Sequence, residues 1–375
     1  MKNYEINSQK CSLYIHLPFC DKKCFYCAFP IVVGQHQRVD RYLRCIDRES
    51  KIYKCPKMET LYIGGGTPTF LTACQLRDLF QNLRSNFDCS GLTEVTVEAN
   101  PEGLSEDKLS VLKEEGVTRI SLGVQTFQDK YLKYLGRIHA RDQIFKSYDL
   151  CRRFFDNVNV DLMFNFPHQT QTELDQDLSD LMSLGSEHVS IYSLTIEAPS
   201  RFFTRQVQLA SDEIQGRYYQ HVVASIAKMG CVQYEVSNFA RSGFESLHNM
   251  HYWQMGEYIG LGMGAHSFWN GRRYANVSKL SEYMDKSESG VSTMVEESTV
   301  STKELFQDAL VFGLRMNRGV SLKELSERYG AQLSTQQERH IQTMVEEGMF
   351  VWSGKYLQAT DRGRVVLDEI SLGLI

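Results

Sequence analysis

The chain has 375 residues and carries 41 Lys and Arg against 46 Asp and Glu, a net charge of −5, with 42% apolar residues. This balance excludes a disordered chain, a fibre and a coiled coil, and the acidic charge argues against a bulk nucleic-acid binder. No stretch approaches the ~18 consecutive apolar residues of a membrane-spanning helix, and the first residues lack the apolar core of a secretory signal. We therefore expect a globular, cytoplasmic protein that binds no nucleic acid.

The first two-thirds of the chain alternates short β-branched runs with amphipathic stretches. The expected strands are Ser12–Leu17, Thr60–Ile63, Glu94–Glu98, Arg119–Gly123, Val158–Met163 and Val189–Leu194. The expected helices are Arg38–Tyr53, Thr72–Asn86, Ser105–Glu115, Arg141–Phe155 and Thr172–Leu184. This rhythm is typical of βα units, in which parallel strands are joined by helical crossovers.

Six such units make either an open barrel or a doubly wound sheet. Special residues follow successive strands: Cys20, Gly64–Thr67, Glu98, Gln125 and Asp161. In a barrel these strand ends converge on one mouth, whereas a doubly wound sheet would concentrate them near one switch point. We therefore predict an α/β fold built on an open (βα)6 partial TIM barrel.

Three domains are expected. Residues 1–210 form the barrel, and residues 211–300 form a middle region that completes the core, with a helix over Asp212–Met229 and a segment rich in His, Gly and aromatic residues. Residues 301–375 predict a winged-helix-like domain with helices over Thr302–Met316, Ser321–Tyr329 and Thr335–Glu347 and a hairpin at Ser353-Gly354. Nine basic and ten acidic side chains in this domain favour a structural or partner-docking role over DNA binding.

Three of the ten cysteines lie in one short stretch, Cys20, Cys24 and Cys27, with the spacing C-x3-C-x2-C directly after a strand. Three thiolates in one loop can hold three corners of a [4Fe–4S] cluster and leave the fourth iron open for a chelating ligand. A zinc site completed by His16 and a set of unliganded thiols are the alternatives. The other seven cysteines are scattered and are expected to be small buried apolar residues.

This cysteine loop after a barrel strand resembles the radical SAM superfamily, in which the open iron binds S-adenosylmethionine. Ile63-Gly64-Gly65-Gly66-Thr67-Pro68, after the second strand, is similar to the glycine-rich loop of that family. A plain turn remains the alternative for this loop, and a phosphate-binding loop would need a lysine that is absent. The order of strand-end residues resembles the anaerobic coproporphyrinogen oxidase branch. That resemblance implies S-adenosylmethionine contacts from Tyr14, Tyr26, Gly65, Gly66, Thr67, Glu98, Gln125, Arg137 and Asp161.

Two kinds of protein in that branch have to be separated, the oxygen-independent coproporphyrinogen III oxidases and the heme chaperones of the HemW type. The oxidases have a further cysteine two residues after the third, where this chain has Phe29, and a longer segment before the first strand. The run His248-Asn249-Met250-His251-Tyr252-Trp253 is similar to the His-Asn-x-x-Tyr-Trp motif of the chaperones. The resemblance therefore implies a protein that binds heme and transfers it to an acceptor protein. Some of these acceptor proteins are expected to be membrane-associated.

Heme binding also has a physical basis in this run. A neutral imidazole is a common heme ligand, and we expect the ligand to be His248, with His251 and His266 as alternatives. Tyr252, Trp253 and Trp269 would stack on the macrocycle, and glycines at 260, 262 and 264 would let it approach the backbone. The competing interpretations are a core strand with an incidental histidine, a porphyrin-modifying radical SAM enzyme, and a DNA-binding sensor of iron or redox state.

The chain departs from the branch at three positions. Ala28 replaces an aspartate, and Asn165 and His168 replace glycines. All three are expected near the barrel mouth, where they would alter how a ligand is held without removing a cluster ligand.

Overall fold

The computed structural model describes residues 11–53 and 57–375. Six parallel strands form its centre and follow the predicted order along the chain: β1 (Cys11–Leu17), β4 (Met58–Gly65), β5 (Glu94–Ala99), β6 (Arg119–Gln125), β7 (Asn157–Phe164) and β8 (His188–Ser193). Each pairs with the next in parallel, so the expected open (βα)6 partial barrel is confirmed. Two short strands, β2 (Phe19–Cys20) and β3 (Val32–Val33), pair with each other beside the barrel mouth.

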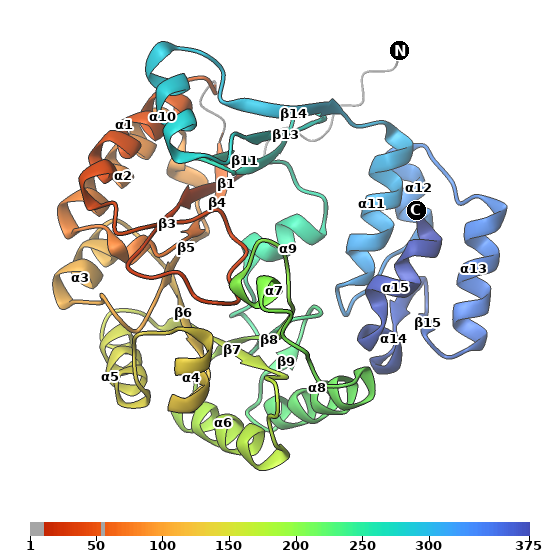
Figure 1. Ribbon diagram of the computed structural model, residues 1–375. Coiled ribbons are helices and arrows are strands. Elements are labelled where there is room, and N and C mark those ends of the chain that lie inside the picture. The colour runs from red at the N-terminus through yellow and green to blue at the C-terminus, as the bar shows by residue number, and fades with distance from the viewer. Residues whose placement is uncertain (1–10, 54–56) are drawn as a thin grey trace.

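Helices cover the outer face of these strands (Figure 1). They are α1 (Val39–Ser50), α2 (Ala73–Asn86), α3 (Glu106–Glu114), α4 (Asp129–Leu135), α5 (Arg141–Arg152) and α6 (Gln171–Leu184). The short helix α7 (Arg201–Thr204) lies elsewhere and contacts Phe25, whose carbonyl accepts from the Phe202 amide at 2.9 Å. Thr72 and Thr170 begin α2 and α6 with complete capping boxes, which satisfy backbone amides that a helix start leaves free. The five predicted helices agree with the observed ones to within three residues at each end, and α4 and α7 were not expected.

The middle of the chain extends the sheet at both edges. After α8 (Asp212–Ala227), strands β9 (Val232–Gln233) and β10 (Asn238–Ala240) join the β8 edge, and the chain then returns to the β1 edge through α9 (Leu247–Trp253). Strand β11 (Tyr258–Leu261) pairs in parallel with β1. The remaining elements are β12 (His266–Trp269), β13 (Arg272–Asn276), α10 (Leu280–Ser289) and β14 (Met294–Thr299). A twelve-stranded sheet results.

The C-terminal part packs beside the barrel (Figure 1). Its elements are α11 (Thr302–Leu314), α12 (Leu322–Tyr329), α13 (Thr335–Glu346), β15 (Phe350–Ser353), β16 (Tyr356–Ala359), α14 (Asp361–Val365) and α15 (Leu367–Ser371). The predicted three helices and hairpin are present, and α14 and α15 follow them. A buried apolar cluster that includes Met255, Phe268 and Phe306 joins this part to the middle region. No helix of the described ranges is long and apolar enough to cross a membrane.

The barrel strands alternate apolar and polar residues with a period of two. The apolar residues, such as Ile120 and Leu122 of β6, pack into the main core with the surrounding helices. The polar residues face the barrel lumen and are buried as well, including Thr96, Arg119, Asn159 and His188. Lumens of TIM barrels are usually filled by bulky branched side chains. The lumen of this barrel is therefore lined by buried polar side chains, and the sequence pattern alone does not predict this.

Candidate cofactor site at the barrel mouth

Of the three clustered cysteines, Cys20 ends β2, and Cys24 and Cys27 lie in the loop between β2 and β3. Cys20 is buried, and Cys24 and Cys27 are partly exposed. The loop is held to α4 by a hydrogen bond from the Phe25 amide to the Leu135 carbonyl, 2.8 Å long. Of the scattered cysteines that the structure describes, Cys74 is exposed and Cys89 half-buried, so the expectation of burial is wrong for these two. Cys55 lies outside the described residues.

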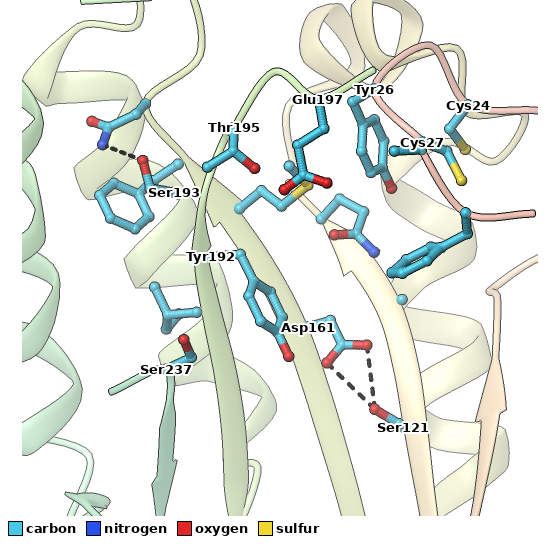
Figure 2. Close-up of a pocket in the computed structure, with 18 of the residues that line it drawn as sticks. Cys24, Tyr26, Cys27, Ser121, Asp161, Tyr192, Ser193, Thr195, Glu197 and Ser237 are labelled. Carbon is cyan, nitrogen blue, oxygen red and sulfur yellow. Dashed lines mark hydrogen bonds between the residues drawn. The ribbon is translucent and has the colours of Figure 1, made fainter. Parts of the chain in front are cut away.

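A cavity of about 1080 Å³ opens at the carboxyl ends of the barrel strands. All three clustered cysteines line it. So do eight of the nine residues implied for S-adenosylmethionine: Tyr26, Gly65, Gly66, Thr67, Glu98, Gln125, Arg137 and Asp161. Figure 2 shows Cys24, Tyr26 and Cys27 at one end of this cavity and Asp161 and Tyr192 deeper in it. The parallel barrel thus brings together residues that are far apart in the sequence.

Tyr14 does not line the cavity. Its hydroxyl contacts Nδ1 of His16 at 3.1 Å, while Nε2 of His16 contacts the Pro30 carbonyl oxygen at 3.0 Å. His16 is buried with both ring nitrogens engaged and is also outside the cavity. The alternative of a zinc site would therefore need His16 to break these contacts and turn toward the cysteines.

The glycine-rich loop fits closely under the cysteine loop. A Cβ atom on Gly66 would lie within 2.8 Å of backbone atoms of residues 17 to 19, and one on Gly65, where φ is +108°, would overlap the His16 ring. The amides of Gly66 and Thr67 donate to the carbonyls of Leu17 and Phe19, each at 2.8 Å. These glycines are therefore required by the packing of the loop on β1 and β2, in addition to any ligand.

A chain of polar side chains connects Cys20 to Cys24. The Thr67 hydroxyl lies 3.5 Å from Cys20 Sγ and accepts a 2.9 Å hydrogen bond from the Asn100 amide. Asn100 in turn accepts from Arg137 at 2.8 Å, and Arg137 approaches Cys24 Sγ at 3.6 Å. Arg137 is nearly buried, and its Nε has no hydrogen-bond partner among the described residues. A guanidinium beside thiolates offsets their negative charge, as an anionic cluster requires. Sequence reasoning missed Asn100, although it directly follows β5.

Glu98 is held inside the mouth by two donors. Its carboxylate accepts from the Tyr62 hydroxyl at 2.8 Å and from the Gly65 amide at 3.0 Å. Burial and the nearby Asp161 raise the pKa of Glu98, whereas the hydrogen bonds from Tyr62 and Gly65 and the charge of Arg119 lower it. The net result is a pKa of about 7. This carboxylate therefore titrates close to neutrality.

Asp161 is the second carboxylate of the mouth. The Ser121 hydroxyl lies 3.3 Å from both carboxylate oxygens (Figure 2), and Asn159 donates to one of them at 2.7 Å. Burial raises the pKa of Asp161, and Arg119 is the largest opposing influence.

The lumen continues this network toward the opposite end of the barrel. Asn159 contacts Nδ1 of His188 at 2.6 Å, and Nε2 of His188 contacts the Tyr234 hydroxyl at 2.8 Å. That hydroxyl accepts from the Ser246 amide at 3.1 Å, at the start of α9. Arg119, which is 1% exposed, lies within 3.3 Å of His188. Sequence reasoning missed Arg119, Asn159 and His188.

The histidines expected to bind heme do not lie in this cavity. His248, on α9, is buried, and its ring nitrogens contact Thr60 at 2.7 Å and Tyr252 at 2.8 Å. Burial lowers the pKa of His248 to about 3, so its ring is neutral. His251 lines a separate cavity of about 530 Å³ with Met250 and Met316, and His266 is exposed on β12. The structure does not bring the three histidines to one site, and their role in heme ligation stays a prediction.

The other residues of that segment serve the fold. Trp253 packs on Phe312 of α11, with the Arg315 guanidinium 5.2 Å from its ring. A Cβ on residue 260 or 262 would meet the His266 carbonyl or the Tyr42 hydroxyl within 2.4 Å. The His-Asn-x-x-Tyr-Trp run thus forms a helix that joins the barrel to the C-terminal part.

Two of the three positions at which the chain departs from the branch, Asn165 and His168, have a backbone conformation that favours glycine. Asn165 and His168, which replace glycines, have φ angles of 62° and 60°. Glycine adopts this left-handed conformation without strain, and asparagine tolerates it better than most residues. Asn165 lines the cavity and donates to Ser193 at 2.8 Å, and Ala28 lines it as well.

The fold and the site together define a radical SAM protein. Residues 14–181 match the model of the radical SAM superfamily, and residues 300–366 match the HemN C-terminal domain. The solved coproporphyrinogen III oxidase HemN from Escherichia coli has the same fold, with a TM-score of 0.87 and 22% identity over 98% of this chain and 90% of that one. Membership of the superfamily implies a [4Fe–4S] cluster and S-adenosylmethionine.

The sequence comparisons define the family more closely. The chain is 37% identical to the heme chaperone HemW of Bacillus subtilis over 96% of this chain and 97% of that protein. It is 34% identical to the heme chaperone HemW of Lactococcus lactis over 94% of each. A mitochondrial radical S-adenosyl methionine domain-containing protein 1 from Bos taurus is 30% identical over 98% of this chain and 88% of that protein. The chain belongs to the HemW family.

Proposed function

We propose that this protein is a heme chaperone that binds heme and passes it to acceptor proteins. The observation that carries the proposal is the similarity to two heme chaperones over at least 94% of the chain. The position of the oxidases' further cysteine holds Phe29, whose side chain is 66% exposed and lines the cavity. A phenylalanine there cannot supply the thiol that those enzymes carry.

In this proposal Cys20, Cys24 and Cys27 hold the cluster. The three thiols line one cavity, and the nearby Arg137 and Lys22 offset the negative charge of thiolates. When bound, the cluster would supply an iron without a protein ligand, available to S-adenosylmethionine. Glu98 and Asp161 would accept hydrogen bonds from hydroxyl groups of that cofactor, and Tyr26, Gly65, Gly66, Thr67, Gln125 and Arg137, which line the same cavity, would contact the rest of it.

The affinity for S-adenosylmethionine is expected to depend on pH through Glu98. An ionised carboxylate accepts two hydroxyl hydrogen bonds, whereas the protonated acid must donate one proton. Because the pKa of Glu98 is raised to about 7, lowering the pH below about 7 should weaken binding by up to about tenfold per pH unit. Equilibrium dialysis of the reconstituted protein at a series of pH values measures this. Glu98→Gln should remove the dependence, and a wild-type profile that coincides with the variant's would contradict the role of Glu98.

A porphyrin-modifying enzyme is the second candidate, because the HemN fold is shared over 98% of the chain. Anaerobic incubation with coproporphyrinogen III, S-adenosylmethionine and a reductant separates the two functions. The chaperone is expected to form no protoporphyrinogen above a cluster-free control, as followed by chromatography. Product formation over many turnovers would reject the chaperone in favour of the oxidase.

A further inference from the structure

The cavity at the barrel mouth continues well beyond the cysteine loop. Its second part, which we name the distal lobe, is lined by α8 residues, by Val236 and Ser237, and by Arg315 and residues 364–369 of the C-terminal part. Figure 2 shows Ser237 and Tyr192 at the end of the cavity away from Cys24 and Cys27. The whole cavity, about 1080 Å³, exceeds the ~300–1,000 Å³ that is usual for one small-molecule site. It therefore offers room for a ligand beside the cofactors at the cysteine end.

The walls of the cavity present unfilled apolar surface. Phe29 and Ile138, beside the cysteine loop and Arg137, are 66% and 50% exposed, and Val365 in the distal lobe is 39% exposed. Three further apolar residues line the distal lobe, Val236, Val366 and Leu367. Exposed apolar side chains in a cavity mark binding sites. Aromatic and branched side chains around one cavity suit a large, flat, apolar molecule.

The distal lobe also carries two fixed cations. The side chains of Arg315 and Arg364 are only 24% and 15% exposed, whereas their ion-pair partners Asp368 and Asp361 are 83% and 87% exposed. Ion pairs with such solvated carboxylates contribute little to stability. The Nε of Arg315 is buried and has no hydrogen-bond partner among the described residues.

An incoming carboxylate would compete with these solvated aspartates and, at Arg364, with Gln233 Oε1 at 3.3 Å and the Ala359 carbonyl oxygen at 3.1 Å. The other charged groups of the distal lobe are the carboxylates of Asp212, Asp368 and Glu369, which cannot bind an anion. Recognition of a carboxylate at this end of the cavity therefore depends on the two arginines, whose planar guanidinium groups match carboxylate geometry.

We propose that the distal lobe binds the porphyrin ligand, with the macrocycle against the apolar wall and its carboxylates paired with Arg315 and Arg364. The proposal rests on the heme-chaperone function and adds the location and the anchoring residues. No histidine among the described residues lines this cavity. Binding there is therefore driven by apolar contact and by carboxylate pairing, and iron-free protoporphyrin should compete with heme.

Absorbance titrations with heme and with heme dimethyl ester, whose carboxylates are blocked, test the proposal. Arg315→Gln and Arg364→Gln should each weaken heme binding by about tenfold to a hundredfold, the range for a hydrogen bond to a charged group. Arg362→Gln is the matched control, because Arg362 is exposed on the same helix as Arg364 and does not line the cavity. It should bind heme like the wild type, and the ester should bind all four proteins equally weakly.

The ester comparison needs only the wild-type protein, so the test does not depend on how well a variant folds. Saturable heme binding that the ester matches, with both variants unchanged, would overturn the distal-lobe site and leave the chaperone function in place. Absence of saturable heme binding by the wild type would instead reject the chaperone function, and the distal-lobe site with it.

Discussion

Replacing Cys20, Cys24 and Cys27 together with alanine is expected to remove the iron–sulfur cluster completely. The three thiols are the cysteine ligands available at the barrel mouth, since they line one cavity and no other cysteine does so within the described ranges. Reconstituted wild-type protein should contain roughly four irons per chain, and the triple variant should contain none and lack the brown absorbance. Iron and sulfide analysis after anaerobic reconstitution measures this.

Cys74→Ala is the matched control, because Cys74 is exposed on α2 and lies outside the cavity. Its iron content should equal that of the wild type. A heme titration of the triple variant, compared with the wild type, then shows whether heme binding depends on the cluster. Retention of full iron and colour by the triple variant would contradict the cluster assignment.

Removing the buried cation of the lumen is expected to destabilise the protein strongly. Arg119 is 1% exposed and lowers the pKa of both Glu98 and Asp161. Arg119→Met removes the positive charge that stabilises the ionised form of these buried carboxylates and the contact with His188. We expect a loss of about 3–5 kcal/mol, the cost of leaving a buried charge uncompensated. Denaturant unfolding under anaerobic conditions measures the loss. Since the pKa of Glu98 then rises, the pH below which S-adenosylmethionine binding weakens should also move upward.

Arg41→Met provides the comparison. Arg41 pairs with Asp285 and Glu288 on the surface, where water screens an ion pair and its loss changes stability little. An Arg119→Met variant that loses no more stability than Arg41→Met would show that the lumen is screened by water and does not depend on this cation.

Much of the barrel mouth could be predicted from the sequence, because parallel βα units impose their own geometry. Once the strands are located, the residues at their carboxyl ends must meet at one mouth. That argument predicts that Cys20, Glu98 and Asp161 share one mouth, and all three line one cavity. Tyr14 was implied only by the family resemblance. It lies within β1, where its hydroxyl contacts His16 and it does not line the cavity, so its role in cofactor binding stays a prediction.

The lumen was missed although its signal is present in the sequence. Strand β6 reads Arg119-Ile120-Ser121-Leu122-Gly123, an alternation that usually indicates a strand with one face in solvent. Here both faces are buried, because the polar residues of six strands satisfy one another inside the barrel. Single-strand patterns do not show which polar residues will meet, and this pairing decides whether burial is tolerated.

Helix α9 was missed for a different reason. The run Leu247–Trp253 is aromatic-rich and short, and isolated helices of this length are not stable on their own. Its start is capped by Ser246, whose hydroxyl accepts from the Asn249 amide, and by Glu94, which accepts from the amides of Leu247 and His248. The Ser246 cap is a local signal, but Glu94 lies more than 150 residues earlier in the chain, so a local pattern contains only part of this information.

Heme titration of the anaerobically reconstituted protein, followed by absorbance, tests the chaperone function most directly. We predict saturable binding with one heme per chain, because the family relatives are heme chaperones over nearly the whole length of this chain. A linear, unsaturable response indistinguishable from that of a protein without a heme site would contradict the account.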